Sequence, residues 1–136
     1  MRKEDLSNEY LARIATDWIA YFSAPEESRD SDLSLTNPFG IVCELVRYSS
    51  VYAWDLILFI LEEDRNDRTL DLLSAGPLED FIGEHGRNYI ELIEEAAQDS
   101  ARFRSLLAGV WQLRTADDIW TRVVAARGDA TPFVCD

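Results

Sequence analysis

The stretch AGPLEDFIGEHG, residues 75–86, contains the only histidine of the chain, three carboxylates and residues that break helices. Carboxylates beside an imidazole could transfer protons or bind a metal ion. At 100° per residue on a helix, however, His85 shares the apolar face with Phe81, whereas Asp80 and Glu84 lie on the far side. We therefore expect a partly buried His85 that hydrogen-bonds the end of its helix or a neighbouring carbonyl.

The other residues of this stretch have ordinary roles at helix ends. Pro77 suits the first position of a helix, where its missing N–H costs nothing, and Glu79 lies in a first turn that favours negative charge. Gly86 is typical of a helix end. The sequence therefore predicts a short helix from Asp67 to Gly76, a sharp turn, and a second helix that ends at Gly86.

Helical periodicity extends along most of the chain. Asn37 and Ser49 or Ser50 are suitable caps, and Thr115 with Asp118 forms a capping box for a last helix closed by Gly128. No segment shows sustained two-residue alternation. The remaining expected helices cover residues 5–23, 38–47, 51–64, 87–98 and about 100–112.

The fold class that follows is all-α. We expect seven or eight short helices in one domain over residues 1–136, arranged as an irregular bundle or a short two-layer array. An acidic, serine-rich loop is expected over 24–36 and a flexible tail over 129–136.

The charge distribution limits the classes of partner. The 136 residues carry a net charge of -13, and residues 51–99 hold 13 acids against 3 bases. Such a field repels nucleic acids and anionic membranes and attracts basic proteins. Cys43 and Cys135 form neither a disulfide framework nor a metal-type pair, and no signal peptide or membrane span is evident. We therefore expect a cytoplasmic protein.

Catalytic motifs are missing from the sequence. There is no histidine–glutamate pair for a metal, no nucleophile motif and no phosphate-binding glycine loop, so we expect no enzyme, no metal and no cofactor. Asp55 is the one charge inside an apolar helix. We interpret it as a buried or half-buried partner of an arginine such as Arg47, or as a first-turn contact with the helix dipole.

Carboxylates gather along the middle of the chain, with few lysines or arginines between them. Like charges at helical spacing repel one another and destabilise the helix slightly, so such a run requires an explanation. One interpretation is a solvated helix face, and the other is a docking surface for a basic partner. The candidate partner-binding residues are Glu62, Glu63, Asp64, Asp80, Glu84, Glu91, Glu94 and Glu95.

The C-terminal part carries the compensating charge. Residues 100–127 hold 5 arginines and 2 acids. These arginines can form ion pairs with the acidic middle of the same molecule or with a second copy, and the first is the simpler interpretation. The spacing i, i+3, i+4, i+7, i+8 predicts that five residues of this part belong to the core: Phe103, Leu106, Leu107, Val110 and Trp111.

The segments GPLEDFIGEHG (76–86), YIELIEEAA (89–97), FRSLLAGVW (103–111) and DDIWTRV (117–123) follow one another in this order. They resemble a family of small bacterial all-helical domains of unknown function, with a Gly-Pro-Leu-Glu-Asp helix, a His-Gly pair and a Gly-Val-Trp segment. The resemblance covers roughly residues 70–123 and implies a bacterial helical domain without implying a reaction.

The function that this sequence favours is protein binding. A small acidic domain without catalytic groups fits a protein that neutralises a basic partner, as a bacterial immunity protein or antitoxin does, or one that mimics nucleic acid charge. The alternative is a structural or regulatory module that forms a homodimer through its arginine- and tryptophan-bearing C-terminal helices.

Overall fold

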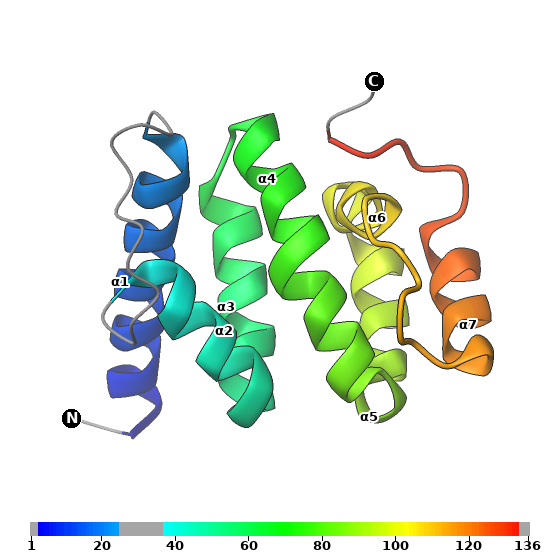
Figure 1. The fold of residues 1–136 in the computed structure, drawn as a ribbon, viewed down its shortest axis with the longest axis horizontal. Coiled ribbons are helices and arrows are strands. Elements are labelled where there is room, and N and C mark those ends of the chain that lie inside the picture. The colour runs from blue at the N-terminus through cyan, green and yellow to red at the C-terminus, as the bar shows by residue number, and fades with distance from the viewer. Residues whose placement is uncertain (1–2, 25–36, 134–136) are drawn as a thin grey trace. The chain divides into compact units, whose positions relative to one another are not determined.

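Helices make up most of this computed structural model, which describes residues 3–24 and 37–133. The chain folds as two compact units, Met1–Thr69 and Leu70–Asp136, and each unit is described by itself. In the first unit, α1 (Lys3–Ser23) packs against both α2 (Pro38–Tyr48) and α3 (Ser50–Glu63), as Figure 1 shows.

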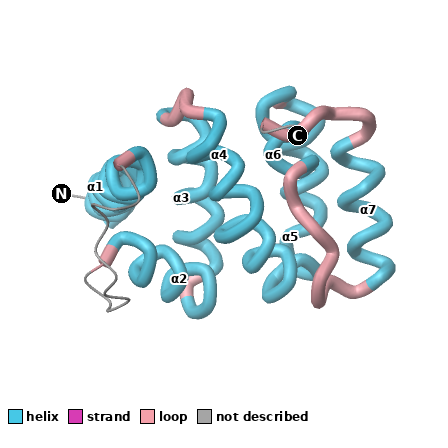
Figure 2. The backbone as a smooth tube through the Cα atoms, turned by 45° about the horizontal axis from the view of Figure 1, so that its top comes forward, coloured by secondary structure: helices cyan, strands magenta, loops and turns pink. Residues whose placement is uncertain are grey.

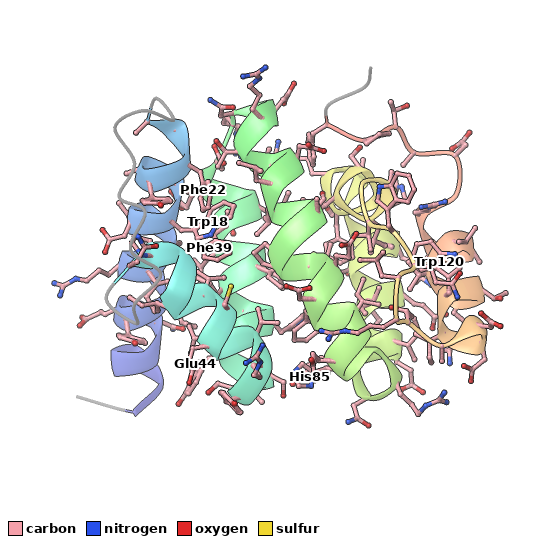
Figure 3. The ribbon with its side chains drawn as sticks, viewed as in Figure 1. Trp18, Phe22, Phe39, Glu44, His85 and Trp120 are labelled. Carbon is pink, nitrogen blue, oxygen red and sulfur yellow. The ribbon has the colours of Figure 1, made fainter. Side chains whose placement is uncertain are left out.

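The apolar stripe of α1 forms much of the first unit's core. Leu11, Ile14 and Trp18 are buried along it. The Trp18 ring lies 4.7 Å from that of Phe22, which in turn lies 6.2 Å from Phe39 of α2 (Figure 3). Aromatic rings at these separations and tilts attract one another beyond the area that they bury, so this row of rings joins α1 to α2.

The starts of α2 and α3 lie close to the predicted positions. The Asn37 Oδ1 accepts a hydrogen bond of 2.8 Å from the Phe39 N–H, and Pro38 occupies the first helical position. This cap is confirmed. Ser49 precedes α3 without capping it through its side chain. α3 buries Ile57 and Ile60 and contacts both other helices of the unit.

The second unit is built around one long helix. α4 (Asp67–Leu73) begins just before the unit and continues through a π-helical turn, η2 (Ser74–Leu78), directly into α5 (Glu79–Asp99). α5 contacts α6 (Ala101–Ala108) and α7 (Asp117–Arg127), which also contact each other. Figure 2 shows the connection from α6 as a long loop that leads to the start of α7.

Two predicted helix boundaries in this region are wrong. The chain does not turn at Gly76 and Pro77, because the wider π-helical turn lets the helix continue past a residue that lacks an N–H. The helix also passes through Gly86. A Cβ atom at Gly86 would lie 3.1 Å from the Ile119 Cγ2, so this glycine allows close packing of α7 and does not end the helix.

The ends of α6 and α7 give a mixed result. Ser100 caps α6, but the helix stops at Ala108 instead of continuing to about Gln112. Thr115 and Asp118 do not form the predicted capping box, since Ala116 is the N-cap of α7 and makes no side-chain hydrogen bond. The predicted end of α7 is confirmed.

The termination of α7 shows why a glycine is required there. Gly128 follows the last residue of α7 and has a φ of 58°. This left-handed conformation is unfavourable for residues with a Cβ atom. The glycine therefore closes the helix as the sequence predicts.

The all-α fold class is confirmed: the described residues contain seven α-helices and one π-helical turn, without strands. The single domain over residues 1–136 stays a prediction. Of the expected acidic loop, residues 25–36 lie outside the described part, as do residues 134–136 of the expected flexible tail. In the described part of that tail, the Phe133 ring contacts α6, since the Arg102 guanidinium lies 5.6 Å from its centre.

Candidate protein-binding surface

The acidic residues of α5 lie on one continuous helix. Asp80, Glu84, Glu91 and Glu95 are all exposed, and at 100° per residue they fall within about 60° of one another around the helix axis. We call these four residues the α5 acidic stripe. Because the helix does not end at Gly86, the two halves of the stripe keep a fixed register.

Two of the predicted carboxylates are partly neutralised from within the unit. The Arg114 Nη2 lies 2.8 Å from the Glu84 Oε1. The Arg122 Nη2 and Nε donate to the two carboxylate oxygens of Glu94 at 2.6 and 2.9 Å. Pairing of the C-terminal arginines with the acidic middle of the same molecule is therefore confirmed.

A third ion pair joins α5 to α7, as the Arg122–Glu94 pair does. The Arg87 guanidinium donates to both carboxylate oxygens of Asp118, at 3.0 and 3.1 Å. The hydrogen bond from Arg87 lowers the pKa of Asp118, and the one from Arg122 lowers the pKa of Glu94. The Arg87–Asp118 and Arg122–Glu94 pairs tie α5 to α7. Asp80, Glu91 and Glu95 form no ion pair in the described part of the chain.

The three candidates at the end of α3 do not behave alike. Glu62 and Glu63 are exposed, whereas Asp64 is only 4% exposed and follows the last turn of α3. The Asp64 Oδ1 accepts a hydrogen bond of 2.9 Å from the Asn66 N–H. Its assignment to an exposed binding surface is therefore wrong, because this carboxylate shapes the turn into α4. The common surface of Glu62 and Glu63 with the α5 acidic stripe stays a prediction.

His85 lies among aromatic rings. Its imidazole centre is 5.3 Å from the centre of the Phe81 ring and 6.5 Å from that of the Tyr89 ring. The side chain is half-buried, and its placement on the apolar face is confirmed. The expected hydrogen bond to the end of its helix is wrong, because α5 continues for several turns beyond Gly86, whereas the alternative of a hydrogen bond to a neighbouring carbonyl stays a prediction.

The expected role of Asp55 is also wrong. Its side chain is exposed and lies in the second turn of α3, beyond the reach of a first-turn dipole contact. Within the described residues no ion pair joins it to Arg47, whose guanidinium lies 6.0 Å from the centre of the Tyr48 ring. Partial burial nevertheless raises the pKa of Asp55.

An exposed apolar loop follows α6, and it was not predicted from the sequence. Phe103, Leu106 and Val110 are buried as expected, but Trp111 is 72% exposed and Leu113 equally so. The prediction of a core Trp111 is wrong because α6 ends at Ala108. Gly109 in the Gly-Val-Trp segment was the available signal, since glycine commonly follows the last residue of a helix.

Metal binding and membrane insertion are two further possibilities for a helical chain. Within residues 3–24 and 37–133, no three histidine, cysteine, aspartate or glutamate side chains gather so that they could hold a metal ion. Over the same residues, none of the helices combines the length and the hydrophobicity that crossing a bilayer requires.

Comparison with known proteins places the chain in a family. No match was found among curated proteins or among solved structures. A family described as "Family of unknown function (DUF6869)" matches residues 27–131, which is most of the chain. The chain therefore belongs to DUF6869, a family of unknown function.

Proposed function

We propose that this chain is a non-catalytic protein that binds and neutralises a basic protein partner, as a bacterial immunity protein or antitoxin does. The observation that carries the proposal is the α5 acidic stripe on a single uninterrupted helix. A rigid row of exposed carboxylates can face the lysines and arginines of a partner at once. Charge of this kind speeds encounter and selects among partners.

The local charge balance supports this function over a merely solvated surface. Asp80, Glu91 and Glu95 have no ion pair within the described residues, although three arginines of the same unit form pairs close by. Glu91 and Glu95 are one turn apart and repel each other by a few tenths of a kcal/mol. A basic partner would relieve that repulsion.

The chemistry of the partner follows from the stripe. A cationic cleft that normally holds phosphate groups would accept a row of carboxylates, so a toxin or another nucleic-acid-binding protein is the favoured partner. In this form of the proposal the chain mimics nucleic acid charge and acts in the bacterial cytoplasm. It would not itself bind nucleic acid, because its net charge of -13 repels phosphates.

The competing function is self-association through the C-terminal helices. The arginines that would carry it are engaged within the unit, since Arg114 and Arg122 form ion pairs and the Arg127 guanidinium lies 5.5 Å from the centre of the Trp120 ring. Replacing these contacts by equivalent ones with a second copy would yield little net free energy of association. This observation favours a separate basic partner.

Co-expression with the products of adjacent genes tests the proposal. We expect a complex that survives gel filtration at low salt and weakens as salt rises, because ion pairs are screened. Calorimetry of Glu91→Gln/Glu95→Gln is expected to show at least about 10-fold weaker binding, in keeping with loss of close charge pairs.

The matched control removes two exposed carboxylates elsewhere. Asp17→Asn/Glu44→Gln changes the net charge equally and lies on α1 and α2. Its affinity is expected to stay close to that of the wild type. Equal losses in both double variants would assign the effect to overall charge and contradict a specific stripe. Absence of any salt-sensitive complex with a basic protein would contradict the function itself.

A further inference from the structure

We propose that the exposed side chains of Trp111 and Leu113 form a hydrophobic anchor, which packs against apolar side chains of a basic protein segment. We call residues 109–116 the anchor loop. This inference rests on the proposed function and adds to it the apolar contact that the acidic stripe lacks. The favoured occupant is a segment in which lysines or arginines flank apolar side chains.

The exposure of the two side chains is the first observation. Trp111 and Leu113 are each 72% exposed, although the neighbouring Val110 is buried in the second unit. Tryptophan is among the residues that most often dominate binding energy at interfaces. Leaving it in water forfeits the hydrophobic free energy of burial unless a partner covers it.

The second observation is that hydrogen bonds hold the anchor loop in place. The Trp111 N–H donates to the Glu79 Oε1 at 2.8 Å. The Gln112 Nε2 donates to the Thr115 carbonyl at 3.1 Å and to the Asp117 Oδ1 at 2.7 Å. A loop that is already ordered loses less conformational entropy on binding than a mobile one.

Backbone strain at the tip is the third observation. Leu113 has a φ of 41°, in the left-handed region that costs a leucine about 1–2 kcal/mol. Strained residues persist where the surrounding structure holds them, and they cluster at binding and switch sites. Here the strained residue is also a highly exposed apolar one.

The charges around the anchor loop select the occupant. Its hydrogen bonds and its ion pair involve three carboxylates, on Glu79, Glu84 and Asp117, against the guanidinium group of Arg114. The surroundings are thus net negative. A basic segment would find charge complementarity here, whereas a second copy of this acidic chain would meet repulsion.

Two synthetic peptides of equal positive charge and about 12 residues test the anchor. One alternates lysine with leucine and the other lysine with serine. By fluorescence anisotropy, we expect the wild-type chain to bind the leucine peptide at least about 10-fold more tightly than the serine peptide. A difference of this size is what one hot-spot contact contributes to binding. Trp111→Ala/Leu113→Ala is expected to abolish that preference and to leave the affinity for the serine peptide unchanged.

Tyr48→Ala is the matched control, because Tyr48 is also highly exposed, at 69%, but lies on α2. It is expected to keep the preference for the leucine peptide. Unchanged circular dichroism melts would show that the double variant folds. Equal affinity of the wild type for the two peptides, or a preference that survives Trp111→Ala/Leu113→Ala, overturns the anchor.

The remaining outcomes separate this inference from the function on which it rests. If neither peptide binds in a salt-dependent manner, the proposed function fails and the anchor with it. If the serine peptide binds and leucine adds nothing, only the anchor fails. A wild-type dimer in sedimentation velocity that Trp111→Ala makes monomeric would assign the loop to a second copy and overturn the basic occupant.

Discussion

The Arg114 side chain passes over Gly83 of α5 to reach Glu84, where the Nη2 and Oε1 atoms lie 2.8 Å apart. A Cβ atom at position 83 would lie 2.8 Å from the Arg114 Nε and 3.1 Å from its Cγ. The missing side chain at Gly83 therefore gives Arg114 the room that this ion pair uses. The pair fixes the anchor loop to the helix that carries the α5 acidic stripe.

Gly83→Ala is expected to disrupt that pair while changing overall stability little. Alanine stabilises a helix interior by about 1 kcal/mol relative to glycine, and an exposed ion pair contributes about 0–1 kcal/mol. Arg114 is exposed enough to rotate into solvent. We expect the free energy of unfolding in urea to change by less than about 1 kcal/mol, from the balance of these two terms.

A double-mutant cycle with Glu84→Gln and Arg114→Gln measures the pair directly. The coupling energy is expected to be present in the wild-type background and to vanish when the cycle is repeated in the Gly83→Ala background. A loss of more than about 2 kcal/mol in Gly83→Ala alone would contradict this account, because it would exceed the contribution of an exposed pair.

Gly86→Leu is expected to destabilise the second unit. A Cβ atom there would lie 3.1 Å from the Ile119 Cγ2 and 3.4 Å from the Ile82 Cγ2, and all three residues are buried. A leucine would push α7 away from α5, and overpacking of this kind costs about 1–3 kcal/mol. Chemical denaturation should show this loss in the free energy of unfolding.

Gly76→Leu is the matched control for that substitution. No atom lies within 4 Å of a Cβ atom built at Gly76. The same change of residue should therefore cost little at this position. Equal destabilisation by Gly76→Leu and Gly86→Leu would mean that close approach of α7 is not the reason for a glycine at position 86.

The helices were easier to predict from the sequence than their ends. The apolar period places each buried face, and the cap at Asn37 depends only on neighbouring residues. The roles of Gly86 and Gly109 depend on residues far along the chain. Gly86 packs against Ile119 of α7. A Cβ atom at Gly109 would lie 2.9 Å from the Ser74 Cβ. Local rules cannot reveal such contacts.

The candidate surface was predictable in outline for the same reason. Helical spacing puts Glu91 and Glu95 on the solvent side of α5, where the structure has them. Charge counting suggested arginine pairs within the molecule, but only the packing of α7 selects Glu94 for Arg122. Asp64 was misplaced because its burial depends on how the chain turns after α3.

The ion pairs between α5 and α7 should make stability depend on acidity. The hydrogen bond from Arg122 lowers the pKa of Glu94 from its ordinary value of 4.5, and the one from Arg87 lowers the pKa of Asp118 from 3.8. Carboxyl groups of lowered pKa stabilise the fold above the unfolded-state value and lose that contribution as pH falls through the folded-state value.

Thermal melts from pH 7 to pH 2 measure this dependence. The wild type should lose Tm on acidification more steeply than Arg87→Gln/Arg122→Gln, and the two Tm values should converge at the acid end. Raised salt should narrow the difference at neutral pH, because these pairs are exposed. Parallel curves for the two proteins would show that the pairs contribute nothing to folding.

Asp55→Asn should have the opposite effect on stability. Partial burial raises the pKa of Asp55 above its ordinary value of 3.8, so the fold disfavours the charged form. This cost is present above the folded-state pKa and disappears below the unfolded-state value. Removing the charge should therefore raise Tm at pH 7 and leave it unchanged near pH 2.

The same melts of Asp17→Asn control for the loss of one negative charge from a strongly acidic chain. Asp17 is an exposed residue of α1. The gain in Tm at pH 7 should be larger for Asp55→Asn than for Asp17→Asn, because only the former also removes the cost of burying charge. A lower Tm for Asp55→Asn at pH 7 would instead show that the carboxylate has a stabilising partner, as the sequence had suggested with Arg47.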